Sequence, residues 1–167
     1  SAPRSPLEGA ALFGDVDLSG DTGARAAVDA IVARFGRLDA LVNIAGGFRW
    51  EPLAEGSLET WNTLYELNLR TAVAACRAAL PHLPSERGRI VNIGAAGAVK
   101  AGAGMGAYAA SKAGVARLTT MEFAARHLVH FVEVKRNHRD NRCRSREARY
   151  HDDAERRPRP FAARTAA

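Results

Sequence analysis

Apolar residues along this chain follow two patterns, short unbroken runs and stripes with helical spacing. Residues 39–44 and 89–93 are short apolar runs without alternation, and each ends at a glycine-containing turn. Runs of this kind are typical of strands that are buried on both faces of a parallel sheet. Residues 58–80, which lie between them, have the period and length of a helix, and Ser57 is a suitable residue to cap its first turn.

The helical spacing of apolar residues predicts the faces of two helices. The first face comprises four apolar residues that recur at i, i+3, i+4 and i+7, namely Val28, Ile31, Val32 and Phe35. The stripe of the helix over 58–80 consists of Trp61, Leu64, Tyr65, Asn68, Leu69, Ala72 and Cys76. We expect both stripes to be buried against the sheet and the neighbouring helices.

Shorter segments complete the predicted order of elements. Residues 12–15 are expected to end a short strand, residues 107–128 to form a helix, and residues 131–134 to form a strand. Strands and helices that alternate with short links predict an α/β fold, here a three-layer, Rossmann-like parallel sheet. Such a sheet normally opens with a strand, a Gly-rich turn and a helix, and nothing before Asp15 supplies them. We therefore expect a truncated fold that lacks its first βα unit and its C-terminal strands.

Charge divides the chain into two parts. Residues 1–134 contain 13 Lys and Arg against 13 Asp and Glu, whereas residues 135–167 contain 11 basic and 5 acidic residues and carry the whole net charge of +6. The second part has ten Arg but no Leu, Ile, Val or Met. It cannot bury enough apolar surface to offset the entropy cost of ordering. We expect a neutral domain over 1–134 and a basic tail over 135–167 that is disordered or translated out of frame.

Composition narrows the class of protein further. No apolar run approaches the roughly 18 residues of a membrane span, and the first residues contain no apolar segment of signal-peptide type. The two cysteines, Cys76 and Cys143, give no disulfide framework, and Cys76 is expected to be a small core residue. The histidine spacing matches no zinc site, so no metal is expected. These features favour a cytoplasmic protein.

Tyr108 and Lys112 are the clearest candidates for chemistry. They lie four residues apart in the predicted helix over 107–128, so their side chains share one helix face. A lysine cation beside a phenol favours the phenolate and lowers the tyrosine pKa. A tyrosine of this kind can donate and accept a proton near neutral pH. Taken alone, however, the two residues are better explained as an ordinary solvated pair.

Other motifs in the chain favour a catalytic role for Tyr108 and Lys112 over an ordinary solvated pair. In chain order the motifs are Asp15-Val16, Asn43-Ile44-Ala45-Gly46, Asn68, and Tyr108 with Lys112. They resemble the Asp-Val, Asn-Asn-Ala-Gly, helix-asparagine and Tyr-x-x-x-Lys motifs of the short-chain dehydrogenase/reductase family, with Ile44 in place of the second asparagine. The resemblance covers roughly residues 10–128 and makes residues 1–134 a partial dinucleotide-binding domain of Rossmann type.

This resemblance implies an NAD(P)-dependent oxidoreductase that acts on a small carbonyl or alcohol substrate. Tyr108 would be the general acid/base, and Lys112 would hold the nicotinamide ribose and lower the tyrosine pKa. The cofactor, NAD or NADP, would supply the hydride. Asn68 would hold a water in the proton relay from Lys112, although a structural asparagine satisfied by backbone groups is the alternative.

The resemblance also implies a set of cofactor-binding residues. Asp15 would lie near the adenine ring, and Asn43, Ala45 and Gly46 would line the cofactor channel together with Tyr108 and Lys112. Family members usually form homodimers or homotetramers through their two long helices, here residues 58–80 and 107–128. Small residues at Ala109, Ala113 and Ala116 would allow a close approach.

One position departs from the family pattern. The family has a serine thirteen residues before the tyrosine, where this chain has Ala95, so the substrate oxygen would lose one hydroxyl partner. Ser111 is not expected to replace it, because it points off the face shared by Tyr108 and Lys112. Two short stretches, residues 45–47 and 104–108, are similar to dihydropteridine reductase, which also has a non-hydroxyl residue there.

Two alternatives to an active enzyme remain at this point. The first alternative is an inactive fragment. Missing strands would leave sheet edges unpaired, so such a fragment is expected to be marginally stable. Alternatively, the Arg-rich tail over 135–167 makes the chain a non-catalytic module that binds nucleic acid. The tail offers only Tyr150 and Phe161 for stacking on bases, which disfavours nucleic acid as a partner.

Overall fold

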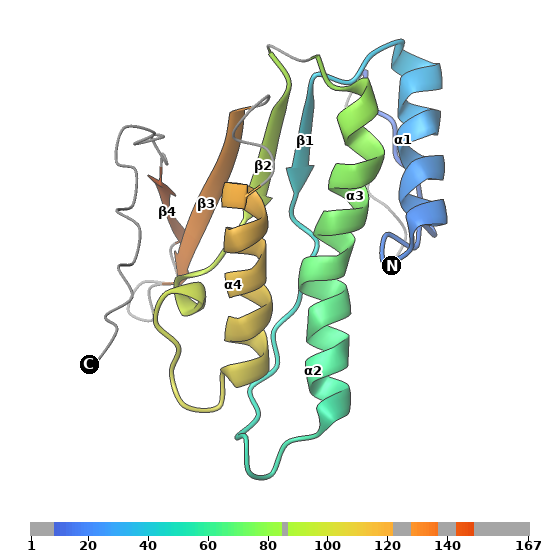
Figure 1. The fold of residues 1–167 in the computed structure, drawn as a ribbon. Helices are drawn as coiled ribbons and strands as arrows, with labels where there is room; N and C mark the ends of the chain where they lie inside the picture. The colour runs from blue at the N-terminus through green and yellow to red at the C-terminus, as the bar shows by residue number, and fades with distance from the viewer. Residues whose placement is uncertain (1–8, 85–86, 122–127, 137–142, 149–167) are drawn as a thin grey trace, which may run out of the picture.

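Helices pack on a sheet of four strands in the part of the chain that the structure describes (Figure 1). This computed structural model describes residues 9–84, 87–121, 128–136 and 143–148. In chain order the elements are α1 (Asp21–Phe35), β1 (Ala40–Asn43), α2 (Leu58–Tyr65), a π-helical turn (Glu66–Arg70), α3 (Thr71–Ala79), a 3₁₀ turn (Leu80–His82), β2 (Arg89–Ile93), a second 3₁₀ turn (Ala96–Ala98), α4 (Gly106–Met121), β3 (Leu128–Arg136) and β4 (Cys143–Ala148).

The sheet has the strand order β1-β2-β3-β4. β1 and β2 are parallel, with Asn43 opposite Asn92, and β2 and β3 are also parallel, whereas β4 runs antiparallel to β3. The parallel pairs confirm the predicted α/β fold with a Rossmann-like parallel sheet. The apolar run over 89–93 becomes β2 with the predicted bounds, and the predicted strand over 131–134 lies within β3.

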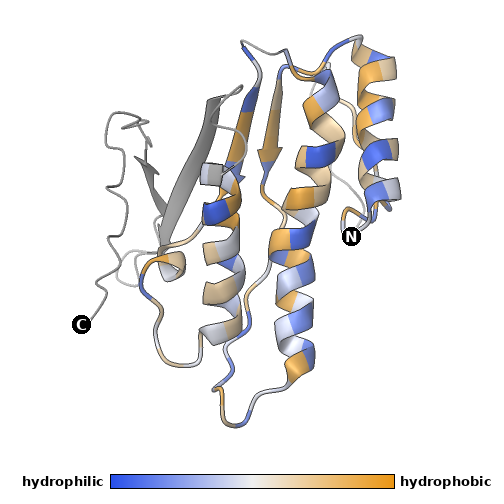
Figure 2. Cartoon of the chain, in the orientation of Figure 1, coloured by the Kyte–Doolittle hydropathy of each residue, from blue (hydrophilic) through white to orange (hydrophobic). Residues whose placement is uncertain are grey.

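The core lies where α1 and α3 meet and where α3 packs on β1. Its buried members are mostly small residues: Ala24, Val28, Ala74, Cys76, Ala78, Ala79, Leu83 and Ile90. Small side chains at a helix contact allow the two helix axes to approach closely. In Figure 2, β1 is mostly hydrophobic, whereas α1 and α3 each carry both hydrophobic and hydrophilic residues.

The predicted helix over 58–80 is confirmed, but it is built in several pieces. Ser57 Oγ accepts a 3.3 Å hydrogen bond from the backbone N–H of Thr60, so Ser57 caps α2 as expected. A π-helical turn over Glu66–Arg70 then joins α2 to α3. Such a turn interrupts the regular i to i+4 hydrogen bonding and is frequent at functional sites. The interruption falls on the part of the helix that carries Asn68.

The buried stripes are narrower than the sequence predicts. In the helix over 58–80, the buried stripe residues are Leu64, Asn68, Ala72 and Cys76. Trp61 and Tyr65 are 36% and 52% exposed, and Phe35 in α1 is 45% exposed, so the prediction that these three are buried is wrong. Each lies at the margin of its stripe, because the arc of a helix that packing covers is narrower than the arc that spacing alone predicts.

β1 also differs from its prediction. On one face Leu41 packs against the core and Asn43 is partly buried, but on the other face Val42 is 51% exposed. The expectation of a strand buried on both faces is therefore wrong for β1, because the described helices that contact it lie on the Leu41 side. β2 agrees better, since Ile90 and Asn92 on one face are fully buried and Val91 and Ile93 on the other face are half-buried.

Two predicted boundaries need correction. Residues 12–15 are irregular, with Asp15 at a φ of 54°, so the predicted strand end is wrong there. The structure describes no strand beside them, and an extended segment becomes a strand only when another segment pairs with it. The predicted helix over 107–128 extends too far, since Leu128 already begins β3 and residues 122–127 lie outside the described residues.

The basic segment over 135–167 lies mostly outside the described residues. Within it the structure describes β4, which pairs with β3 and places Arg146 opposite Glu133. Lys135 and Arg136 also belong to this segment and end β3, and strand pairing of this kind needs no apolar side chains. For residues 137–142 and 149–167, the expected disorder or frame shift stays a prediction.

The described residues provide neither a membrane-spanning helix nor a metal cluster. No helix in these ranges is long and apolar enough to cross a bilayer. These ranges also contain no group of three or more His, Cys, Asp or Glu side chains that could hold a metal ion.

We predict that Cys76 resists alkylation in the folded protein. Its side chain is fully buried, which confirms it as a core residue, and burial raises the pKa of its thiol to about 11. The reactive thiolate is therefore scarce at about pH 8. In a Cys143→Ser variant, a thiol reagent should modify Cys76 only as fast as the protein opens, and at once in denaturant. Rapid alkylation of the native variant would contradict this burial.

Candidate active site

Tyr108 and Lys112 lie one turn apart near the start of α4, as the sequence predicts. Tyr108 is half-buried, whereas Lys112 is only 6% exposed. The Nζ atom of Lys112 donates a 3.0 Å hydrogen bond to the carbonyl oxygen of Ile93, the last residue of β2. The lysine is therefore fixed at the carboxyl end of a parallel strand, which is where open α/β sheets bind ligands.

Burial controls the pKa values of this pair. It raises the pKa of Tyr108 above the usual tyrosine value, and it lowers the pKa of Lys112 below the usual lysine value. The expectation that the lysine cation lowers the tyrosine pKa is therefore wrong for the chain without a cofactor. The physical reason is that both charged forms lose hydration in the protein, while the ammonium of Lys112 is directed at the Ile93 carbonyl.

Asn68 links the turn after β1 to α4. Its Oδ1 atom accepts a 2.7 Å hydrogen bond from the N–H of Gly47, and its Nδ2 atom donates to the Gly47 carbonyl at 3.1 Å and to Ser111 Oγ at 2.9 Å. Ser111 in turn donates a 2.8 Å hydrogen bond to the carbonyl of Tyr108. The amide thus spans two elements and is satisfied largely by backbone groups, which was the structural alternative for this asparagine.

Gly46 is the point at which three of the predicted site residues meet. A Cβ atom at this position would lie 2.7 Å from Oδ1 of Asn68 and 3.2 Å from Nζ of Lys112. The first distance is too short for any side chain, so the turn needs glycine here. The structure therefore brings Gly46, Asn68 and Lys112 together, and the space beside the lysine cation is open only because Gly46 has no side chain.

Asn43 has a different environment from the one expected. Its Nδ2 atom donates a 2.8 Å hydrogen bond to Oδ1 of Asn92 and a 3.3 Å hydrogen bond to Sγ of Cys76. Nδ2 of Asn92 continues the chain with a 3.0 Å hydrogen bond to Oγ1 of Thr119. The Asn43 side chain thus ties β1 to β2 and to the helix layer. Any contact of Asn43 with a cofactor would have to use its backbone or its remaining amide oxygen.

Asn92 is a residue of this network that the sequence analysis missed, and the part of Ser111 in the network was not foreseen there either. Asn92 is fully buried and Ser111 is 4% exposed, and both are hydrogen-bonded to other site residues. A signal was present for Asn92, since it is a polar residue at the centre of an apolar run. The Ser111 hydroxyl accepts a hydrogen bond from Asn68 and donates one to the Tyr108 carbonyl.

Ala95, at the position of that serine, is buried and immediately precedes the 3₁₀ turn after β2. The turn continues through Gly97, whose added Cβ would lie 3.5 Å from Cε1 of Tyr108. The segment that carries Ala95 therefore approaches the tyrosine ring. No hydroxyl group is available from Ala95 itself, as the sequence indicates.

The segment after Asp15 meets the turn after β1. A cavity of about 420 Å³ is lined by Val16, Asp17, Leu18, Ser19, Ala45, Thr63, Glu66, Leu67 and Thr71. Ala45 and the residues that follow Asp15 thus line one cavity. Asp15 itself is not among the lining residues, and its backbone is left-handed.

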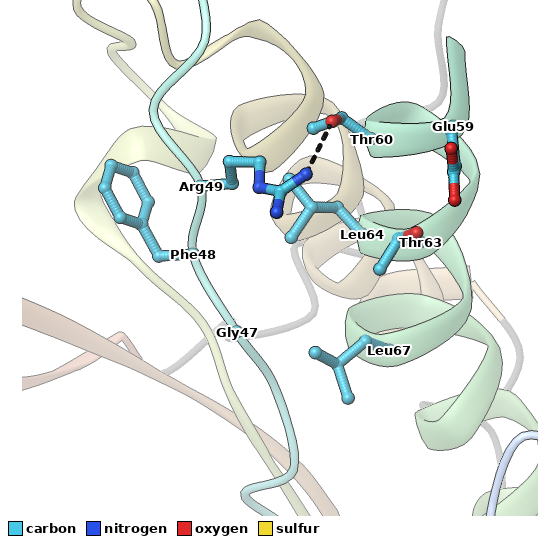
Figure 3. Close-up of a pocket in the computed structure, with 8 residues that line it drawn as sticks. All are labelled: Gly47, Phe48, Arg49, Glu59, Thr60, Thr63, Leu64 and Leu67. Atoms are coloured by element: carbon cyan, nitrogen blue, oxygen red, sulfur yellow. Dashed lines mark hydrogen bonds between the residues drawn. The ribbon is translucent and has the colours of Figure 1, made fainter. Parts of the chain in front are cut away.

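A second cavity, of about 290 Å³, lies between residues 47–49 and α2 (Figure 3). Nη1 of Arg49 donates a 3.3 Å hydrogen bond to Oγ1 of Thr60, which is itself buried. Figure 3 shows Phe48 and Arg49 pointing to opposite sides of the chain. None of the residues that the sequence predicts for the active site lines this cavity, but Phe48, which does, also contacts the ring of Tyr108, so the cavity adjoins the Tyr108 site.

The site as a whole can transfer a proton next to a bound anion or ribose. A half-buried phenol supplies the proton, and a nearly buried lysine supplies a cation and hydrogen-bond donors. The lysine, the side-chain-free Gly46 and the adjacent cavity beside Ala45 fit a dinucleotide that carries hydroxyl and phosphate groups. The residues present are therefore compatible with a nicotinamide cofactor.

Sequence comparison connects this chain to known enzymes. A profile of the family described as short chain dehydrogenase matches residues 4–136. Cyclopentanol dehydrogenase from Comamonas sp. is 37% identical over 113 residues, which cover 67% of this chain and 45% of that enzyme. L-fucose dehydrogenase from Oryctolagus cuniculus is 40% identical over 111 residues, or 65% of this chain and 39% of that enzyme. The chain thus spans less than half the length of these curated relatives.

Solved structures of similar sequence have the same fold. A short chain dehydrogenase from Burkholderia cenocepacia J2315, crystallised in complex with NADP, is 40% identical with a TM-score of 0.58, over 62% of this chain and 42% of that one. A short-chain dehydrogenase/reductase variant from Serratia marcescens is 29% identical with a TM-score of 0.65, over 70% of this chain and 55% of that one.

Proposed function

This chain belongs to the short-chain dehydrogenase family, and on that premise we propose that it is part of an NAD- or NADP-dependent oxidoreductase that interconverts small alcohols and carbonyl compounds. The observation that carries the proposal is the meeting of Gly46, Asn68 and Lys112 one helical turn from Tyr108. The relatives named for cyclopentanol and L-fucose support a small alcohol as substrate, and the neighbour crystallised with NADP supports the cofactor class.

In this proposal Tyr108 moves a proton to or from the substrate oxygen. A tyrosine is protonated at neutral pH, as the donor role in carbonyl reduction requires. Lys112 would hold the ribose of the cofactor, and its positive charge would favour the phenolate when the alcohol is oxidised. When bound, the nicotinamide supplies or accepts the hydride.

The remaining predicted residues have supporting roles in the proposal. Ala45 and Gly46 would line the cofactor, with the segment after Asp15 beside the adenine, while Asn43 would act by tying β1 to β2. Asn68 would position the Gly47 turn against α4. A water relay through Asn68 would use the second lone pair of its Oδ1, since its two amide protons are already donated.

A homodimer or homotetramer through the two long helices is part of the same proposal. Leu58, Trp61 and Tyr65 on α2 are 81%, 36% and 52% exposed, which leaves an apolar strip on that helix. Apolar strips of this kind mark protein interfaces when they are contiguous. A cytoplasmic location stays a prediction.

We expect an Ala95→Ser substitution to raise turnover of a small alcohol by about tenfold or more, because a hydroxyl would then stabilise charge that develops on the substrate oxygen. The measurement is alcohol-dependent reduction of NAD or NADP by the protein as expressed from its gene, with cyclopentanol as the first substrate. Ala98→Ser, in the same 3₁₀ turn, is the matched control and should leave turnover unchanged.

Two results would count against these ideas. An unchanged rate for Ala95→Ser beside a measurable wild-type rate would mean that Ala95 does not face the reacting oxygen. The absence of turnover with either cofactor, in both proteins and with a range of alcohols, would instead remove the oxidoreductase proposal for this chain.

A further inference from the structure

Phe48 lies directly against the ring of Tyr108. The two ring centroids are 4.9 Å apart and the ring planes meet at 87°, which is an edge-to-face contact. This arrangement is a favourable one for aromatic pairs. Phe48 nevertheless remains 57% exposed, so much of its ring is available to a further apolar group that approaches Tyr108.

Contacts on both sides fix the position of Phe48. On its N-terminal side, Gly47 is held by two hydrogen bonds to Asn68. On its C-terminal side, Nε1 of Trp50 donates a 3.0 Å hydrogen bond to the carbonyl of Ala103, and the N–H of Glu51 donates to the carbonyl of Gly104 at 2.8 Å. The segment that carries Phe48 is thus tied to the helix layer and to the loop before α4, so the ring is held in place at the tyrosine.

The surroundings of the Tyr108 ring are apolar. Gly97 and Met105 lie beside it, since a Cβ on Gly97 would be 3.5 Å from Cε1 of Tyr108 and 3.3 Å from Cε of Met105. Ala95, in the same segment as Gly97, brings no hydroxyl group. Arg49, the charged neighbour of Phe48, points to the opposite side of the chain and donates to Thr60 (Figure 3).

From this geometry we infer that Phe48 is a substrate-binding residue, and that the substrates are secondary alcohols and ketones borne on a nonpolar ring. The inference rests on the proposed function, because it places the reacting oxygen at Tyr108. A rigid ring laid on Phe48 buries apolar surface without losing internal rotations. A polyol in the same place would leave hydroxyl groups against Phe48, Met105 and Gly97 without hydrogen-bond partners, which disfavours its binding.

The direct test is ligand binding, which needs no turnover. Cyclohexanone and threitol are titrated into the chain as expressed, in the presence of NADP, and binding is followed by saturation-transfer NMR. The wild-type chain should bind cyclohexanone and should bind threitol at least about tenfold more weakly. Phe48→Ala should weaken cyclohexanone binding by about tenfold or more, and Phe48→Leu, which keeps an apolar side chain, by less.

Arg49→Ala is the matched control, because Arg49 is adjacent in sequence and lies on the opposite side of the same segment. It should leave cyclohexanone binding unchanged. Denaturant unfolding of each variant checks that it is folded, with a midpoint close to that of the wild-type chain.

Several outcomes would overturn the inference. They are no binding of cyclohexanone by the wild-type chain, binding within about twofold of wild type for Phe48→Ala, or equal binding of threitol. In turnover, Phe48→Ala should raise the KM for cyclohexanol with little change in kcat. Failure of the proposed function would give a different result. Ring ketones would still bind in a manner that depends on Phe48, but no alcohol would be turned over.

Discussion

A Tyr108→Phe substitution should lower kcat by about 10²- to 10⁴-fold, which is the range that general acid–base catalysis contributes. The change removes one oxygen atom and keeps the ring that contacts Phe48. Because Lys112 is held by the Ile93 carbonyl and not by the phenol, its position should not change. Cofactor affinity is therefore expected to stay within about threefold of wild type, which separates loss of chemistry from loss of binding.

The measurement combines steady-state turnover with fluorescence titration of NADPH. Tyr65→Phe is the matched control, because Tyr65 lies on α2 with half of its surface exposed and removal of its hydroxyl should leave kcat unchanged. Turnover near the wild-type rate in Tyr108→Phe would exclude Tyr108 as the acid/base. A loss of NADPH binding would instead indicate that the hydroxyl helps to hold the cofactor.

The same variant tests the effect of burial on Tyr108. Its pKa is raised in the folded chain, so the folded state favours the protonated phenol relative to the unfolded state. This contribution to stability is fully present below the usual tyrosine pKa of about 10, and it is lost as the pH rises through the higher folded value. The wild-type chain should therefore lose more stability than Tyr108→Phe when both are titrated through this range.

The elements around the site were largely predictable, because they depend on local patterns. The run over 89–93, the cap at Ser57 and the spacing of Tyr108 and Lys112 each require only a few neighbouring residues, and each prediction is confirmed. The cofactor-side motifs came from a family resemblance, and the structure brings Gly46 next to Lys112.

Other features were not predictable because they depend on contacts between distant segments. The pKa of Tyr108 is raised by burial, which spacing along a helix does not reveal. The hydrogen bond between Asn43 and Asn92 depends on the register of β1 and β2, which places the two residues opposite each other. Whether residues 12–15 form a strand likewise depends on a pairing segment that the described chain does not contain.

Asn68→Ala should lower the free energy of unfolding by about 3 kcal/mol, because three hydrogen bonds of roughly 1 kcal/mol each are lost. Two of these bonds hold the N–H and carbonyl of Gly47, and the third reaches Ser111 on α4. Asn68 is 1% exposed, so water can replace the lost amide only by entering the core. The substitution should also uncouple the Gly47 turn from α4 and thereby reduce turnover.

The matched control is Asn62→Ala, on the exposed side of α2. Alanine is the better helix former by about 0.7 kcal/mol or less, so this control measures the gain in helix propensity that partly masks the loss at Asn68. Denaturant unfolding gives both values, and amide hydrogen exchange at Gly47 reports the local effect, which should be faster exchange in Asn68→Ala alone. If Asn68→Ala were as stable as Asn62→Ala and Gly47 stayed protected, the turn would be held by other contacts. The role left for Asn68 would then be the one that the family resemblance implies, which is to hold a water in the proton relay.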